Sequence, residues 1–168
     1  MNRRGWLLGG AGAAAAVAGA TWALRQQAPS RADGLWALRF AQPGGGELLM
    51  SSFQGRPLVL NFWATWCAPC VRELPAIDRF HRQFASKGWQ VVGLAVDNVE
   101  PVQTFLTRLP LGFAIGVAGV AGLALSRDLG NEVGALPFTA LIDAAGVIRH
   151  RKLGETSLEE LTRWANVT

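Results

Sequence analysis

The sequence predicts an α/β domain in which helices flank a mixed central sheet. An apolar run at residues 58–63 is followed by apolar residues at helical spacing from 71 to 84, and then by a second apolar run at 89–96. This strand–helix–strand order favours a parallel pair of strands. Near the C-terminus, strand patterns at 138–142 and 147–152 are separated by a short turn and followed by a helix pattern. Antiparallel strands beside a parallel pair make the predicted sheet mixed.

The first 25 residues predict a signal peptide or an N-terminal membrane anchor. Arg3 and Arg4 give the chain a basic start, Gly5–Leu24 contains no charged residue, and Arg25 ends the run. Such a run is just long enough to cross a bilayer as a helix, and a basic start keeps the N-terminus in the cytoplasm. We therefore expect the rest of the chain in the periplasm, anchored in the inner membrane or soluble after cleavage. The Arg pair also fits a twin-arginine signal, so both export routes stay open.

Residues 26–33 are polar and predict a linker, which leaves residues 34–168 as the folded domain. The domain is predicted to begin with a β-hairpin. Residues 35–40 indicate its first strand, residues 43–46 its turn and residues 47–50 its second strand.

The central strand at 58–63 leads into a helix that ends near Gly88. Pro69 lies in the first turn of this helix, where a missing N–H costs little. After the strand at 89–96, Asp97 and Asn98 are predicted to cap the next helix.

Two further units complete the chain. A short strand at 113–116 and a helix at 123–129 form an inserted unit before the last two strands. Ser157–Glu160 is a capping box that predicts the start of a final helix. We expect Leu158, Leu161 and Trp164 to lie on its inner face.

The net charge of +4 does not indicate a nucleic-acid-binding surface. Three of the arginines lie in the first 25 residues, so residues 26–168 carry 13 basic against 12 acidic side chains. A nearly balanced domain offers no basic patch for a phosphate backbone.

Both cysteines of the chain lie in the motif Trp66–Cys70, where the central strand passes into the first helix. The first N–H groups of a helix are unpaired and its dipole is positive there, so a thiolate at Cys67 is stabilised. Cys70, one turn later, can attack a mixed disulfide. The motif therefore predicts a dithiol–disulfide redox centre.

Two other interpretations of the cysteine pair fit the sequence less well. Structural zinc needs four ligands, but the chain has no other cysteine, and His81 and His150 stand alone. A purely structural disulfide would close a very short loop, which removes little entropy from the unfolded chain. We expect neither a metal nor another cofactor.

Two motifs give the chain a family resemblance. Phe62–Cys70 followed by Glu73–Pro75 resembles the TlpA/ResA-like, thioredoxin-fold thiol:disulfide oxidoreductases of bacteria, which are exported. Leu136–Thr139 resembles the cis-proline loop of that family. The resemblance covers residues 33–167 and implies a thioredoxin-like fold with an N-terminal hairpin and an inserted strand–helix unit.

The resemblance assigns roles to the residues around the cysteines. Cys67 is expected to be the nucleophile and Cys70 the resolving thiol. Glu73 matches an acidic residue that affects thiol ionisation, although it could also be an ordinary surface glutamate. Ordinary thioredoxin has a buried aspartate where this chain has Asn61. Because Asn61 cannot titrate, proton transfer is expected to pass to Glu73 or water.

Three more residues are candidates for substrate binding. Pro137 is expected to be a cis-proline, with an ordinary trans turn as the alternative. Leu136 before it would shape substrate preference. Trp66 is expected to offer an apolar contact surface, unless it only fills the core.

The function we expect is reduction of protein disulfides outside the cytoplasm. The resemblance implies a membrane thiol electron donor of the DsbD/CcdA type, disulfide-bearing protein substrates, and targets such as apocytochrome c or oxidase copper-site cysteines. A periplasmic disulfide oxidant or isomerase is the main alternative. A thiol peroxidase would need a different cysteine setting, and no Met- or His-rich patch supports a copper-binding chaperone.

Overall fold

The computed structural model describes residues 30–168. The predicted signal or anchor at residues 1–25 and most of the predicted linker lie outside this range. Within the described range, no helix combines the length and the apolar character needed to cross a bilayer.

The domain is built on one seven-stranded mixed sheet with the strand order β2-β1-β5-β4-β3-β6-β7. Strands β3, β4 and β5 run parallel, whereas β6, β7, β1 and β2 join as antiparallel neighbours. The predicted hairpin, central parallel pair and C-terminal antiparallel pair are therefore confirmed. The strands are β1 (Arg39–Ala41), β2 (Glu47–Leu49), β3 (Leu58–Trp63), β4 (Gln90–Ala95), β5 (Ala114–Val117), β6 (Phe138–Ile142) and β7 (Ile148–Leu153).

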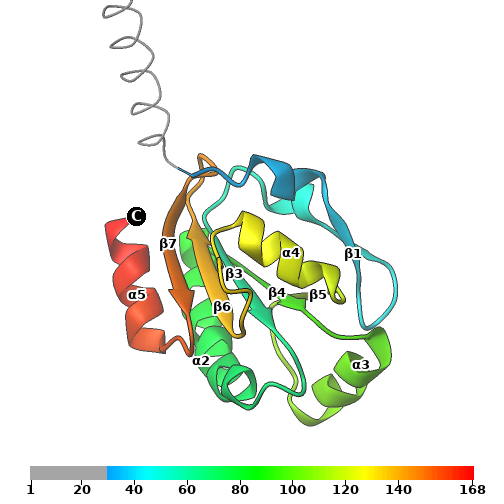
Figure 1. The fold of residues 1–168 in the computed structure, drawn as a ribbon. Coiled ribbons are helices and arrows are strands. Elements are labelled where there is room, and N and C mark those ends of the chain that lie inside the picture. The colour runs from blue at the N-terminus through cyan, green and yellow to red at the C-terminus, as the bar shows by residue number, and fades with distance from the viewer. Residues whose placement is uncertain (1–29) are drawn as a thin grey trace, which may run out of the picture. The chain divides into compact units, whose positions relative to one another are not determined.

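Helices cover both faces of the sheet, as Figure 1 shows for α4 on one side and α2 with α5 on the other. Helix α3 packs on the same face as α2, through Val102 and Phe105. The predicted inserted unit is present as β5 and α4. The helices are η1 (Asp33–Ala37), η2 (Met50–Phe53), α2 (Ala68–Phe84), η3 (Ala85–Lys87), α3 (Val99–Arg108), α4 (Ala121–Asp128) and α5 (Leu158–Val167).

Strand β3 is buried along its whole length and divides its side chains between two apolar clusters. Val59 and Trp63 belong to the cluster under α2, while Leu60 and Phe62 belong to the cluster under α4. This division follows from the two-residue period of a strand. Asn61 shares the α2 face with Val59 and Trp63, so a polar residue occupies a core position there.

The first predicted strand is shorter than expected. Residues 35–37 belong to the 3₁₀ helix η1, and β1 starts only at Arg39. Leu35 and Trp36 are both buried in the same apolar cluster. In a strand, two successive side chains would point to opposite faces, whereas a helical turn lets both pack on one core.

The folded domain begins before the predicted boundary at residue 34, because Ala32 is buried against it, whereas its last helix begins with the predicted cap. The N–H of Ala32, within the predicted linker, donates to the Gly146 carbonyl at 2.9 Å. At the start of α5, the Ser157 hydroxyl accepts from the Glu160 N–H at 3.1 Å, as expected for a helix N-cap. Leu161 and Trp164 are buried on the inner face of α5.

Candidate active site

Cys67 and Cys70 form a disulfide at the beginning of α2. Cys67 is the N-cap residue of the helix, and its sulfur accepts a hydrogen bond from the Cys70 N–H at 3.3 Å. Pro69 occupies the first turn, where the backbone N–H has no helical partner to lose. The Cys67 sulfur therefore lies at the positive end of the helix, the position that favours a thiolate after reduction.

The two cysteine residues differ in access. Cys67 retains 6% exposure, whereas Cys70 is 0% exposed. An incoming substrate sulfur must approach the cysteine that solvent can reach. The difference supports Cys67 as the attacking thiol and Cys70 as the resolving thiol.

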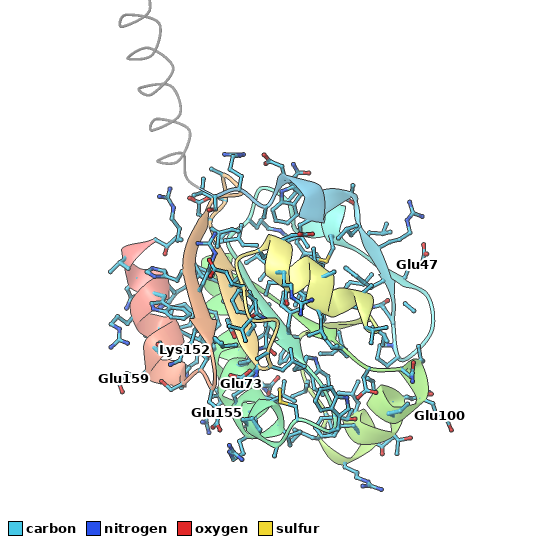
Figure 2. All side chains as sticks on the ribbon, viewed as in Figure 1. Glu47, Glu73, Glu100, Lys152, Glu155 and Glu159 are labelled. Carbon is cyan, nitrogen blue, oxygen red and sulfur yellow. A yellow bond between two sulfur atoms is a disulfide. The ribbon has the colours of Figure 1, made fainter. Side chains whose placement is uncertain are left out.

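Glu73 lies one helical turn after Cys70 and is only 2% exposed, so it is not a surface glutamate. Its two carboxylate oxygens have different partners. The Asn61 side-chain amide donates to Oε1 at 2.7 Å, and the backbone N–H of Thr156 donates to Oε2 at 2.7 Å. Figure 2 shows Glu73 inside the fold, while Glu47 and Glu100 lie at its periphery.

Burial raises the pKa of Glu73 from an ordinary value of 4.5 to about 7. Removal from water disfavours the charged carboxylate and is the largest cause. The hydrogen bonds from Thr156 and Asn61 oppose this rise, and the nearby negative charge of Glu155 adds to it. Glu73 can therefore take up and release a proton near neutral pH, as a proton acceptor for a thiol must.

A small polar cluster surrounds the Glu73 carboxyl within an otherwise apolar core. Asn61 also donates to the Thr139 hydroxyl at 3.0 Å, and the Thr156 hydroxyl donates to the same oxygen at 3.3 Å. Asn61 and Thr139 are directly paired across β3 and β6. Neither Thr139, which ends the predicted proline loop, nor Thr156 was predicted as a site residue. The signal for Thr139 is a hydroxyl residue in a buried apolar strand, but no local pattern marks Thr156.

The proline loop lies at the same end of the sheet as the cysteines. Strands β3 and β6 are antiparallel, and Phe62 pairs with Phe138, so the residues before β6 meet the residues after β3. The Leu136–Pro137 peptide bond is cis, as the sequence predicts. The Pro137 carbonyl accepts from the Gly154 N–H at 2.9 Å, which ties the loop to the end of β7.

The other two predicted contact residues differ in burial. Leu136 is partly buried and packs against both apolar clusters. Trp66 is 68% exposed in the turn before Cys67. Its exposure excludes the alternative that it only fills the core and leaves a large aromatic surface beside the disulfide.

Asp97 holds the loop before the cysteines instead of capping α3. Its Oδ2 accepts from both the N–H of Thr65, at 3.1 Å, and the Thr65 hydroxyl, at 2.6 Å. Asn98 is the N-cap residue of α3 but makes no side-chain capping bond. The capping prediction is therefore wrong, because the parallel pairing of β3 with β4 brings Asp97 beside Thr65 and gives its carboxylate better donors.

The described residues 30–168 contain no group of three or more His, Cys, Asp or Glu side chains that could hold a metal ion.

The fold and the disulfide together define a thioredoxin-like protein with a Cys-x-x-Cys centre. A family model described as Redoxin matches residues 27–166, and the chain belongs to this family. The sequence is 29% identical over 119 residues to the thiol-disulfide oxidoreductase ResA of Bacillus cereus, covering 70% of this chain and 66% of ResA. It is 37% identical over 108 residues to the thiol:disulfide interchange protein DsbE of Vibrio cholerae, covering 64% of this chain and 55% of DsbE.

These matches span just under two thirds of ResA and about half of DsbE. The fold is also similar to a solved thioredoxin-family thiol:disulfide interchange protein from Chlorobium tepidum. The two chains superpose with a TM-score of 0.70 at 21% identity, covering 83% of this chain and 94% of the other. At this identity the similarity establishes the thioredoxin-like fold.

The raised pKa of Glu73 predicts a specific pH dependence of stability. The folded state binds this proton more tightly than the unfolded chain. The contribution of Glu73 to the free energy of unfolding is therefore complete below pH 4.5 and is lost as pH rises through about 7. At about 1.4 kcal/mol per pKa unit, we expect a loss of about 3 kcal/mol. Urea unfolding of the oxidised protein between pH 4.5 and 8 measures it.

Glu73→Gln should remove this loss, because glutamine is neutral at every pH. Glu100→Gln, at an exposed glutamate, should leave the loss unchanged and serves as the control. An identical pH dependence in the wild type and Glu73→Gln would contradict the prediction.

Proposed function

We propose that this protein is an exported thiol:disulfide oxidoreductase that reduces protein disulfides through Cys67 and Cys70. The observation that carries the proposal is a disulfide at a helix N-terminus in which Cys67 retains some exposure and Cys70 has none. The names of the ResA and DsbE relatives support the same reaction.

The reaction is a two-step exchange of sulfur–sulfur bonds. The Cys67 thiolate attacks one sulfur of a substrate disulfide and forms a mixed disulfide with it. The sulfur–sulfur bond of the substrate breaks, and its other sulfur leaves as a thiolate that takes a proton. The Cys70 thiol then loses its proton and attacks the Cys67 sulfur, which releases the second substrate thiolate and closes the Cys67–Cys70 disulfide. Two electrons pass from the protein to the substrate.

Glu73 is suited to accept the proton that Cys70 must lose. It lies one turn along the same buried helix face, and its pKa of about 7 allows it to be ionised when the mixed disulfide forms. The bonds from Asn61 and Thr156 keep the carboxyl in place during the transfer. Water alone is a poor acceptor for Cys70, which solvent does not reach.

Exposed apolar side chains next to the cysteine motif and beside the proline loop favour a protein substrate over a small thiol. The exposed Trp66 directly precedes Cys67. Leu153 is exposed on β7 and pairs with Phe138, the residue after Pro137, and the exposed Val133 precedes the proline loop in the chain. Leu136 adds a partly buried contact. An extended substrate segment can place its apolar side chains on this surface while its backbone lies along the proline loop.

The electron supply and location belong to the same proposal. A protein that reduces disulfides in an oxidising compartment must itself be re-reduced, and we propose a membrane thiol donor of the DsbD/CcdA type. Periplasmic location rests on Arg3, Arg4 and the uncharged run that follows. Targets in cytochrome c maturation or at oxidase copper sites are the substrates we propose to test first.

Cys70→Ser is expected to accumulate a mixed disulfide through Cys67 when mixed in reduced form with insulin or another disulfide-bearing protein. The resolving attack is then impossible, so the intermediate persists. Non-reducing gels and mass spectrometry measure it. Cys67→Ser is the matched control and should trap nothing. Trapping through Cys70 in that control, without trapping in Cys70→Ser, would reverse the two roles.

The Cys67/Cys70 couple should be reducing. The dipeptide Ala68–Pro69 places no histidine between the cysteines to stabilise the thiolate, and Glu73 adds a carboxyl group beneath them. We expect a potential of about −250 mV or lower, near the thioredoxin end of the range. Equilibration with dithiothreitol or glutathione buffers, followed by gel shift, measures it. A value above about −180 mV would favour the oxidant or isomerase alternative.

Export can be tested in living cells. An alkaline phosphatase, which is active only outside the cytoplasm, should be active when fused after Thr168 of the full chain. Replacing Arg3 and Arg4 by Asn is expected to reduce that activity, because the basic start directs insertion. A stable but inactive fusion of the full chain would contradict export.

A further inference from the structure

The Asn61 side chain is buried with one of its two polar ends unused. Asn61 is 0% exposed, and its Nδ2 donates both to Glu73 Oε1 at 2.7 Å and to the Thr139 hydroxyl at 3.0 Å. Its Oδ1 is a buried acceptor without a partner in the described part of the chain. Buried polar atoms are nearly always hydrogen-bonded, so an orphaned oxygen in a fully buried amide needs an explanation.

Ionisation of Glu73 decides whether this arrangement is favourable. The carboxylate has two acceptor oxygens, which suit the N–H donors of Asn61 and Thr156. A protonated Glu73 must place a hydrogen on one oxygen. The Thr156 backbone N–H donates to Oε2 and cannot become an acceptor. The Thr156 side chain also acts on Glu73 as a donor that lowers its pKa, and its hydroxyl donates to the Thr139 hydroxyl at 3.3 Å. The proton therefore belongs on Oε1, where it would face the Nδ2 hydrogens of Asn61 and two donors would oppose each other.

We propose that Asn61 is a reversible positioning residue, whose side-chain amide rotates by half a turn when Glu73 gains or loses its proton. With Glu73 ionised, Nδ2 faces the carboxylate and donates to it. With Glu73 protonated, Oδ1 takes the same place and accepts from the new O–H group. Glu73 thus keeps a partner in both states without moving.

The surroundings allow the rotation. The two ends of an amide have nearly the same shape, so exchanging them requires no repacking of the buried strand. The Thr139 hydroxyl now accepts from Nδ2, and it can turn its own hydrogen toward Oδ1 after the exchange. One end of the Asn61 amide lacks a partner in either orientation. The protonation state of Glu73 therefore determines which of the two orientations is favoured.

Other charged groups near Glu73 are already paired or fixed. Glu155 raises the pKa of Glu73 but forms an ion pair with Arg72. Lys152, on β7 opposite Thr139, is paired with Glu160 of α5. Cys67 and Cys70 do not titrate while they form the disulfide. In the oxidised protein, Glu73 is therefore the group whose titration bears directly on Asn61.

The inference deepens the proposed function, on which its catalytic meaning rests, but the amide rotation can be observed without any redox reaction. The test uses the oxidised protein with ¹⁵N-labelled asparagine and ¹³C-labelled glutamate. The Glu73 carboxyl shift and the nuclear Overhauser contacts of the Asn61 Nδ2 hydrogens are followed from pH 5 to pH 9. We expect contacts to Glu73 and to the Thr139 methyl group above the Glu73 midpoint, and their loss below it.

Asn131 is the internal control. It is also buried, but both ends of its amide have partners: Nδ2 donates to the Ala135 carbonyl at 2.8 Å and to the Ser126 hydroxyl at 3.1 Å, and Oδ1 accepts from the Gly134 N–H at 3.1 Å. Its contacts should therefore be the same at every pH.

Glu73→Gln gives an independent test. The glutamine carbonyl must face the fixed Thr156 N–H, so its amino group faces Asn61. Asn61 should then show the low-pH pattern at all pH values. Asn61→Leu should raise the pH midpoint of the Glu73 titration, which corresponds to about tenfold tighter proton binding. The reason is that the ionised carboxylate loses a hydrogen-bond donor, and bonds to charged groups are the stronger ones. Its profile of Cys67 alkylation against pH should move in the same direction.

The inference would be overturned if the Asn61 contacts stayed the same across the Glu73 midpoint. It would also be overturned if Asn61 in Glu73→Gln showed the contacts expected for the wild type at high pH. The wild-type titration decides the matter even where a variant fails to fold. A failure of the Cys70→Ser trapping experiment would contradict the proposed function and leave the amide rotation standing.

Discussion

The withdrawal of one carboxyl group from water governs the active site. A buried, ionised carboxylate is unfavourable unless donors compensate it, and Glu73 has two such donors in Asn61 and Thr156. They come from the central strand and from the segment after β7, respectively. The carboxyl therefore has both donors only when β3, β6 and β7 have paired. A site whose reactive atoms lie within four successive residues thus depends on contacts between residues 83 positions apart.

The parts of the structure that were predictable from sequence depend on local pattern. The Leu58–Trp63 strand was predicted to its boundaries, because an unbroken apolar run between turn residues is a strong signal. The helix after it was predicted from its three- and four-residue spacing. Leu35 and Trp36 were misassigned, because a short apolar segment reads equally well as a strand or as a 3₁₀ turn.

The site divides in the same way. The motif at Cys67 and Cys70 is visible in the sequence because the chemistry needs both sulfurs on one helical turn. The burial of Glu73 is not visible, since its helix position fits both a surface and a core residue. Thr156 and the bond between Asp97 and Thr65 were missed for a common reason. Both are hydrogen bonds between segments that are far apart in the sequence. The local sequence around a short polar residue does not indicate which distant segment it will contact.

The disulfide and the buried carboxyl cluster around Glu73 therefore occupy different parts of the molecule. The sulfurs occupy the end of the sheet where β3 gives way to α2, and the proline loop stands beside them. Glu73 and its hydrogen-bond partners lie between α2 and the sheet. This separation lets the contact surface change to suit a partner while the buried cluster keeps the same acid–base properties.

The two outer strands of the sheet have a consequence for how the domain meets other polypeptide chains. Unfolded segments tend to add as extra strands to any open sheet edge, which leads to aggregates. At one edge, β2 is only three residues long. At the other, β7 alternates cationic side chains, with Arg149 and Arg151 exposed along it. Short length and charge both discourage strand addition, so an extended polypeptide that comes close to the disulfide finds no open sheet edge on which to grow into an aggregate.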